Sequence, residues 1–371
     1  MVFTEENRQE LEERGYTVVK DVLTAEECEE YVKQYRQWLS ENFSKGEFPL
    51  ASHSLIQRYA IGHLEPTWRV RLKSRDVFAQ IWGTERLLSS TDAVAIGRPP
   101  EQGEEEFYNE DTGGWLHLDQ TTRRQGLHAY QAGVYLEPAD HDDWTLEVLE
   151  NSHRLYEEYY SSNPENHRRA LFRGYMKARD EHLDWMKAHG CVQKRVPVPR
   201  GGMVLWDSRL IHANARPTKG RAHPDRWRFV VFACMAPACW ATQKALDTKR
   251  EAYVTRQMTT HWPCDDVGLM ATSLPSYAAQ ELHPLAKLPE VAQSVEVKRL
   301  VGVLPYPEAK GDEREKELSL LEQRPKWDPE FLPDGLGEEK KNVVPGVTRI
   351  ILMMAIGCAV LVLLSSANSI F

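Results

Sequence analysis

Short apolar runs separated by polar turns dominate the chain between residues 90 and 237. These runs are rich in β-branched and aromatic residues, as strands are. The pattern predicts strands at residues 89–97, 115–120, 126–136, 145–149, 192–199, 203–206 and 226–237. Many short strands in succession are typical of a β-sandwich or barrel. A doubly wound α/β fold is disfavoured, because its strands alternate with helices.

Helices are expected on both sides of this region. Residues 4–14 form a polar helical pattern, and Thr24 with Glu27 predicts the capping box of a helix that runs to about residue 42. A helical insertion is expected at residues 163–190, and residues 248–303 are expected to be mostly helical. The sequence thus predicts a mainly β fold with flanking helices.

The C-terminal part of the chain has a different pattern. Prolines, glycines and charged residues accumulate over residues 306–346, as expected of a tether. Residues 350–371 contain no charge, and about 20 apolar residues suffice to span a bilayer. Basic residues precede this stretch, which favours a cytosolic location for the main domain. We therefore expect a domain at 1–305, a tether at 306–346 and a single-pass C-terminal transmembrane helix at 347–371. The alternative is a buried C-terminal helix.

Composition excludes several classes of protein. The chain has 371 residues, with 42% hydrophobic and 27% charged residues, as is ordinary for a globular protein. A net charge of −9 and the absence of a basic run argue against nucleic-acid binding. The six cysteines contain no Cys-x-x-Cys pair, so zinc ribbons and thioredoxin-type chemistry are disfavoured. No Gly-x-Gly-x-x-Gly or phosphate-binding loop is present.

The chemistry centres on residues 115–120, Trp-Leu-His-Leu-Asp-Gln. On a strand, His117 and Asp119 point to the same face. They supply two thirds of the facial triad of two histidines and one carboxylate that holds ferrous iron in oxygenases. His212, after the apolar run at 203–206, is the candidate third ligand. Each signal is weak alone, since the chain has 13 histidines.

A ferrous oxygenase that uses a 2-oxo acid also needs a cation. The far carboxylate of the co-substrate must be paired when it leaves water, and arginine pairs with it bidentately. Arg226 and Arg228 begin the strand after His212 and lie two residues apart, so both are expected on one face of it.

In their order, these segments resemble the phytanoyl-CoA dioxygenase superfamily of Fe(II)- and 2-oxoglutarate-dependent oxygenases. The resemblance covers about residues 8–305 and is carried by residues 15–28, 115–120, 146–153, 201–212 and 226–232. It implies a double-stranded β-helix, a cupin-like jelly roll, with iron held at one open end. The implied iron ligands are His117, Asp119 and His212.

The resemblance also implies a site for the co-substrate. An arginine near the start of the strand after His212 is expected to bind 2-oxoglutarate. Arg228 lies nearer the body of this strand, but the long interval before Arg226 leaves the choice between them open. Gln131 is a further candidate co-substrate contact, whereas His128 and His153 are expected to be structural.

The implied activity is that of a dioxygenase. Fe(II), 2-oxoglutarate as co-substrate and O₂ are expected, with decarboxylation to succinate and hydroxylation of a C–H bond. Asp119 favours hydroxylation, because relatives that halogenate lack this carboxylate. The substrate is an unidentified small molecule or lipid, the latter suggested only by the expected membrane anchor. A non-catalytic binding or scaffold protein at a membrane and a zinc hydrolase with the same ligands are the alternatives. The sequence leaves the organelle and the oligomeric state open.

Overall fold

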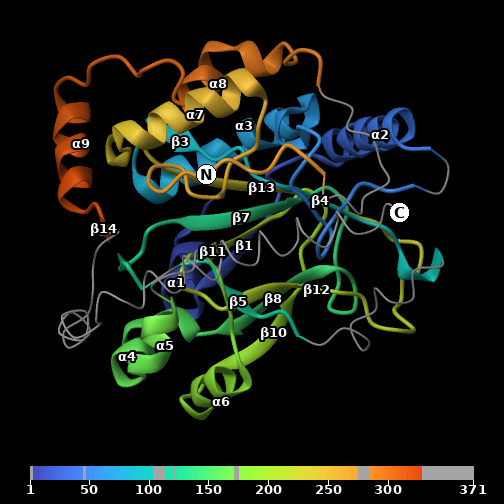
Figure 1. Cartoon of the computed structure of the whole chain (residues 1–371), viewed down its shortest axis with the longest axis horizontal. Coiled ribbons are helices and arrows are strands. Elements are labelled where there is room, and N and C mark those ends of the chain that lie inside the picture. The colour runs from blue at the N-terminus through green and yellow to red at the C-terminus, as the bar shows by residue number, and fades with distance from the viewer. Residues whose placement is uncertain are drawn as a thin grey trace, which may run out of the picture. The chain divides into compact units, whose positions relative to one another are not determined.

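Two antiparallel β-sheets form the core of the chain (Figure 1). The structure is a computed structural model and describes residues 3–44, 47–102, 114–120, 122–170, 175–274 and 285–327. The chain divides into two units, Met1–Trp327 and Asp328–Phe371. The second unit lies wholly outside the described residues, so only the first is described.

The larger sheet has seven strands. In spatial order they are β1 (Tyr16–Val19), β11 (Met203–Asp207), β7 (Tyr130–Tyr135), β13 (Arg228–Pro237), β4 (Val94–Gly97) and β2 (Leu55–Ile56), with β3 (Leu87–Ser89) paired to β13. The strands β4, β7, β11 and β13 are almost wholly buried on both faces, which explains their continuous apolar runs.

The smaller sheet has five strands. They are β10 (Val192–Val196), β8 (Thr145–Glu150), β12 (His212–Ala215), β5 (His117–Leu118) and β9 (Met176–Lys177), and a separate pair joins β6 (Arg124–Gln125) to β14 (Lys326–Trp327). Along the chain, β4, β5, β7 and β8 fall alternately in the larger and the smaller sheet, as do β11, β12 and β13. This interleaving is compatible with a double-stranded β-helix.

Helices flank the two sheets (Figure 1). The helices α3, α7 and α8 lie over the larger sheet, and α4, α5 and α6 lie beside the smaller one. Their bounds are α1 (Glu5–Arg14), α2 (Ala25–Asn42), α3 (Glu65–Trp82), α4 (Tyr156–Ser162), α5 (Pro164–Ala170), α6 (Asp180–Ala188), α7 (Gln243–Thr255), α8 (Val295–Leu300) and α9 (Asp312–Glu322). Short 3-10 helices occur at η1 (Ile61–His63), η2 (Pro100–Gln102), η5 (Ser152–Leu155), η6 (Ala238–Trp240) and η7 (Val291–Gln293).

The local signals in the N-terminal segment are confirmed. The backbone N–H of Glu27 donates to Oγ1 of Thr24 over 3.2 Å, and the Thr24 N–H donates to Oε2 of Glu27 over 3.0 Å. This capping box starts α2, which ends at Asn42. The helix α1 ends at Gly15, whose positive φ of 83° suits glycine.

The expectation of a mostly helical stretch at 248–303 is wrong for residues 256–274. This segment follows α7 as an irregular chain and contains one isolated bridge, between Thr259 and Leu269. Pro263 and Gly268 lie within it, and both residues disfavour a continuous helix. The segment instead lies against the larger sheet, where the Thr259 N–H donates to the Thr91 carbonyl over 2.9 Å.

The prediction of a C-terminal transmembrane helix, and with it of a membrane location facing the cytosol, is wrong as judged by the helices that the structure describes. None of them is long and apolar enough to cross a membrane. The longest, α2 and α3, have 18 residues each and contain many charged side chains. The segment 347–371 lies outside the described residues. An uncharged stretch meets the hydropathy requirement for a span, but hydropathy alone does not establish the continuous helix that a span also needs.

The first unit continues past residue 305 to Trp327. It includes α9 and the strand β14, whose residues pair with Gln125 and Arg124 of β6. The division of the chain at residues 305 and 346 stays a prediction.

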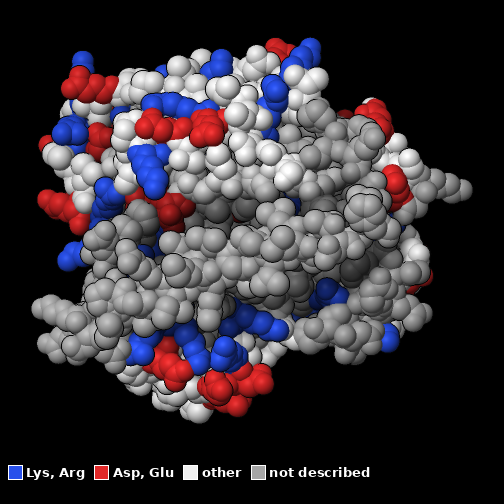
Figure 2. Space-filling view, in the orientation of Figure 1, with Lys and Arg blue, Asp and Glu red and all other residues white. Residues whose placement is uncertain are grey.

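On the face drawn in Figure 2, acidic and basic side chains of the described surface are interspersed rather than separated by sign.

Candidate metal centre

Three side chains that could ligate a metal meet where β5 and β12 lie side by side. The two strands pair antiparallel with His212 directly opposite His117, and Asp119 follows β5. Nε2 of His117 lies 3.5 Å from Oδ1 of Asp119, and Nε2 of His212 lies 3.5 Å from Oδ2. One ligand atom from each residue lies within 4.8 Å of the others. The structure thus brings together the three residues predicted as iron ligands.

Both imidazoles are held in the tautomer that a metal requires. Nδ1 of His117 lies 3.0 Å from the carbonyl oxygen of Trp115, and Nδ1 of His212 lies 3.0 Å from that of Leu210. A carbonyl oxygen only accepts, so each Nδ1 carries the hydrogen and donates it. Each Nε2 is therefore left with a lone pair directed at the cluster, as in metal-ligating histidines.

The carboxylate of Asp119 is held by a hydrogen-bonded pair from the larger sheet. Gln131 and Trp206 are register partners on β7 and β11. Nε1 of Trp206 donates to Oε1 of Gln131 over 2.7 Å, and Nε2 of Gln131 donates to Oδ2 of Asp119 over 3.1 Å. Both ends of the Gln131 amide are thus engaged. Gln131 also lines the cavity, and its expected contact with the co-substrate stays a prediction.

The protonation states also suit a cation. Burial raises the pKa of Asp119, but the nearby imidazoles of His117, His261 and His212 outweigh this effect and hold that pKa well below its usual range. Burial is also the main cause that lowers the pKa of His212. At neutral pH the cluster therefore offers an ionised carboxylate and a neutral His212, the forms in which these side chains bind metals.

The donor set and spacing fit one divalent ion of the ferrous type. Two imidazole nitrogens and one carboxylate form the facial triad of non-haem iron sites. Ligand atoms about 2.1 Å from an ion and at right angles to one another would lie about 3 Å apart. The observed separations of 3.5 Å need only a small contraction to reach this geometry.

A cavity of about 320 Å³ opens beside the cluster. Trp115 forms part of its rim and stacks between two imidazoles, with ring centroids 4.0 Å from His53 and 4.4 Å from His117. Its Nε1 donates to the hydroxyl of Tyr175. Further lining residues from several elements are Asp92, Trp206, Asn214, Phe232, Thr260, His261 and Met270.

Arg228 is a buried cation that is bonded to a residue of the cavity lining. The residue is 3% exposed and begins β13. Its Nη2 donates to Oδ1 of Asn214 over 2.8 Å, and Asn214 lines the cavity two residues beyond His212. Among the described residues, no hydrogen-bond partner meets Nε or Nη1 of Arg228. Burial lowers the pKa of its guanidinium. A buried arginine with free donors is suited to a carboxylate ligand.

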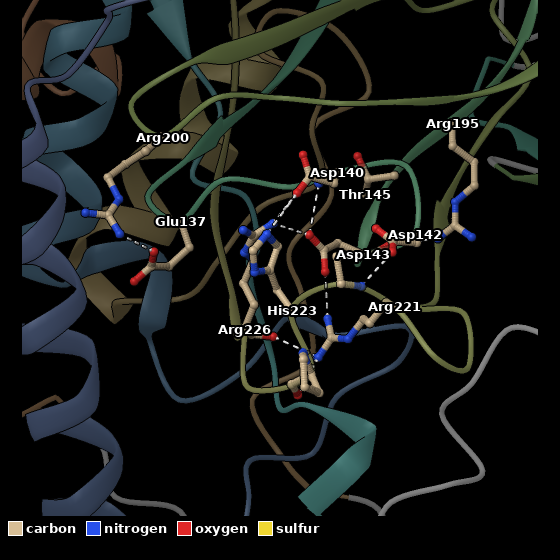
Figure 3. A network of polar contacts seen from close by, with 12 residues as sticks. Glu137, Asp140, Asp142, Asp143, Thr145, Arg195, Arg200, Arg221, His223 and Arg226 are labelled. Atoms are coloured by element: carbon tan, nitrogen blue, oxygen red, sulfur yellow. Dashed lines mark hydrogen bonds and ion pairs between the residues drawn. The ribbon is translucent and has the colours of Figure 1, made fainter.

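Arg226 belongs to a separate ionic network instead (Figure 3). Its Nη1 pairs with Oδ2 of Asp140 over 2.7 Å and with the carboxylate of Asp143. Asp143 also accepts from Nη1 of Arg221 over 2.9 Å, and Arg221 further pairs with Glu101. The network ties the connection before β13 to the turn before β8. Strand periodicity fits both arginines, and the sequence favours Arg228 because it lies nearer the strand body. The two residues have different partners in the structure.

His128 and His153, which are expected from the sequence to be structural, contact protein groups away from the cluster. Nδ1 of His128 lies 3.1 Å from Nη1 of Arg124, and its Nε2 lies 3.1 Å from the carbonyl oxygen of Lys326. Nε2 of His153 lies 3.2 Å from the carbonyl oxygen of Glu12. Neither histidine lines the cavity beside the cluster.

Sequence reasoning missed several residues of the cavity. Asn214 could have been found by strand periodicity, because it shares a face of β12 with His212. Asp92 and His261 lie in irregular connections with no motif around them, and no sequence signal marks them.

The network around Asp143 generates a stability prediction. Asp143→Asn should lower the free energy of unfolding by about 3 kcal/mol, because it removes the charge that two arginines share in a buried site. The Asp143 and Arg221 side chains are 3% and 0% exposed. The matched control is Glu137→Gln, which breaks the more exposed ion pair with Arg200 drawn in Figure 3 and should cost at most about 1 kcal/mol. Urea denaturation measures the free energy of unfolding of both variants. Equal losses would contradict the claim that the buried network around Asp143 is the more stabilising of the two.

Comparisons with known proteins extend these observations. A family model described as phytanoyl-CoA dioxygenase matches residues 11–221, more than half of the chain. The chain is 25% identical over 274 residues to "Ava biosynthesis cluster protein O" of Aspergillus versicolor, covering 69% of this chain and 85% of that protein. It is similar in fold to the crystal structure of GlcNAc Inducible Gene 2 from Candida albicans, with a TM-score of 0.58 and 14% identity over 86% of this chain and 81% of that one. EvdO2 from Micromonospora carbonacea var. aurantiaca, solved in complex with 2-oxoglutarate, matches at a TM-score of 0.40 and 16% identity over 63% of this chain and 91% of that one.

Proposed function

The chain belongs to the phytanoyl-CoA dioxygenase family, and we propose that it is an Fe(II)- and 2-oxoglutarate-dependent dioxygenase that hydroxylates a C–H bond of a small molecule. The observation that carries the proposal is the cluster of His117, Asp119 and His212, in which backbone carbonyls fix both imidazole tautomers. Without a metal, nothing would require two Nε2 lone pairs to be directed at one carboxylate. A cation bound between them accounts for this arrangement.

His117, Asp119 and His212 would hold the iron through Nε2, a carboxylate oxygen and Nε2. When bound, iron with 2-oxoglutarate and O₂ supplies the oxidising power for hydroxylation, and 2-oxoglutarate leaves as succinate and CO₂. The protein's part is positional. Gln131 and Trp206 keep the Asp119 carboxylate in place, and Trp115 packs against the ring of His117. The two sheets enclose the cluster, so that the reaction proceeds shielded from bulk water.

Arg228 would bind the far carboxylate of 2-oxoglutarate. Its Nε and Nη1 lack protein partners among the described residues, while Asn214 fixes the guanidinium through Nη2. An uncompensated buried charge is costly, and a bound carboxylate would remove that cost. The pairing of Arg226 with Asp140 and Asp143 supports the choice of Arg228 for this role.

The ionised Asp119 favours hydroxylation over halogenation, because relatives of this family that halogenate leave that ligand position to chloride. A purely binding or scaffolding role is less well supported. It would leave unexplained both the metal-like geometry of the cluster and the free donors of the buried Arg228.

Anaerobic titration tests the iron site directly. Addition of Fe(II) and 2-oxoglutarate to the full-length protein should produce the weak visible absorption band of the chelate, because the cluster leaves coordination positions open. His117→Ala should abolish the band by removing one ligand. His141→Ala, which alters an exposed histidine outside the cluster, should retain it. A wild-type protein without the band would overturn the proposed function, and binding of zinc but not Fe(II) would favour a hydrolase.

The two arginines give a second prediction. Arg228→Gln should weaken 2-oxoglutarate binding by about 10- to 100-fold, the loss expected when a charge-assisted pair is removed. Arg226→Gln should change this affinity by less than about threefold, since its partners are protein carboxylates. Titration of the absorption band with 2-oxoglutarate measures both constants. If Arg226→Gln weakened 2-oxoglutarate binding more than Arg228→Gln did, Arg226 and not Arg228 would be the residue that binds the co-substrate.

A further inference from the structure

The cavity contains a second polar group of residues that neither the candidate iron site nor Arg228 uses. It consists of Asp92, in the connection between β3 and β4, and of Thr260 and His261, in the irregular segment after α7. We call these three residues the polar wall. The charge of Asp119 affects the pKa of both Asp92 and His261, so the wall lies within electrostatic reach of the candidate iron site.

Hydrogen bonds between the two connections hold the polar wall together. The Thr91 N–H donates to Oγ1 of Thr259 over 3.0 Å, and the Thr259 N–H donates to the Thr91 carbonyl over 2.9 Å. Asp92 and Thr260 each follow one of these paired residues. Oγ1 of Thr260 in turn accepts from the Gly268 N–H over 3.0 Å. The wall is therefore built by two segments far apart in sequence and fixed to each other.

The carboxylate of Asp92 is only partly satisfied by the protein. Its Oδ1 accepts from the N–H of Ala93 over 2.6 Å, and within the described part of the chain no donor lies within hydrogen-bond reach of Oδ2. The fully buried Arg71, whose charge lowers the pKa of Asp92, does not pair with this carboxylate. The Arg71 guanidinium donates to three backbone carbonyls instead, those of Gly62, Asp92 and Phe232.

His261 offers a second unsatisfied atom. Its Nε2 is enclosed and has no hydrogen-bond partner among the described residues. Burial lowers the pKa of the ring to about 4, so the imidazole is neutral at physiological pH. Burial also raises the pKa of Asp92, to about 6, which leaves most of this carboxyl ionised at pH 7. Nε2 of His261 is a buried polar atom without a partner, which is costly, and Oδ2 of Asp92 is an oxygen of a cavity-lining carboxylate that no described donor meets. A ligand with a suitable polar group would satisfy both atoms.

The rest of the cavity suits an apolar body. Leu55, Ala93, Phe232 and Met270 line it together with the polar wall, and its volume is about 320 Å³. An occupant must therefore be small, with an apolar skeleton and one polar group that donates a hydrogen bond to a carboxylate. Hydroxyl and amino groups share this chemistry.

We propose that the polar wall is the substrate-recognition site, and that the substrate is a small, largely apolar molecule whose hydroxyl or amino group donates to Oδ2 of Asp92 and contacts Nε2 of His261. The proposal rests on the proposed oxygenase function, because the wall faces the candidate iron site in the same cavity. Anchoring at the wall holds a C–H bond of the substrate beside that site, and the required distance between anchor and reacting carbon then sets the regioselectivity.

A matched pair of probes tests the wall. 2-Naphthol and 2-methoxynaphthalene have the same apolar skeleton and differ in the hydrogen-bond donor. Equilibrium dialysis against the full-length protein measures their affinities, both in the metal-free form and after anaerobic loading with Fe(II) and 2-oxoglutarate. Wild-type protein should bind 2-naphthol at least about tenfold more tightly than the methyl ether, as expected for a hydrogen bond to a charged group.

Variants assign the preference to the wall. Asp92→Ala and His261→Phe should each reduce the ratio of the two affinities severalfold, whereas Asp184→Asn, at an exposed aspartate of α6, should leave it unchanged. Circular dichroism melts identify any variant that fails to fold. Equal binding of the two probes by the wild type, no binding of 2-naphthol, or a folded Asp92→Ala protein with full preference would each overturn the proposal.

The metal-free measurement separates the two claims. If the iron band fails to appear but the 2-naphthol preference is present in the metal-free protein, the proposed function is overturned and the polar wall stands as a binding site. If the band appears and the preference is absent, only the polar wall is overturned.

Discussion

Antiparallel pairing of β5 with β12 is the constraint on which the whole site depends, because it sets His117 directly opposite His212. Alternation of side chains along the strand then brings Asp119 to the same point. The two-sheet core serves this pairing. The neighbouring β8 pairs with β12 on its other side, and the larger sheet supplies Gln131 and Trp206 from across the interior. A one-residue slip of either strand would turn a ligand away from the cluster.

The distribution of satisfied and unsatisfied buried groups separates structural from functional residues. Arg221 and Arg226 both pair with Asp143 in the turn before β8, and Arg71 donates to three backbone carbonyls. Arg228 and Asp92 are different. Nε and Nη1 of Arg228 and Oδ2 of Asp92 have no hydrogen-bond partner among the described residues, and Asp92 lines the cavity. Because leaving a buried charge unpaired costs stability, a fold that retains such groups indicates ligands for them. The proposed co-substrate site and the proposed substrate wall rest on this one argument.

The three candidate metal ligands were predictable from the sequence, whereas residues placed by contacts between distant segments were not. Strand periodicity and the order of motifs pointed to His117, Asp119 and His212, because metal ligation demands particular residue types at particular spacings. The same periodicity could not separate Arg226 from Arg228, since the deciding partner, Asp143, lies far away in sequence. His261 was hidden in a segment misjudged as helical, where tertiary contacts replace local hydrogen bonds. The expected C-terminal anchor rested on hydropathy and on the basic residues before the apolar stretch, and no described helix bears it out.

The measurement closest to the central claim is the release of CO₂ from 2-oxoglutarate labelled at its first carbon, with and without Fe(II), in air. The account predicts slow, Fe(II)-dependent release by the wild-type protein even without a known substrate, and none by His117→Ala, which removes one imidazole of the cluster. Equal release by the wild-type and His117→Ala proteins would contradict the claim that this cluster is the iron site, and so would release by the wild-type protein that needs no Fe(II).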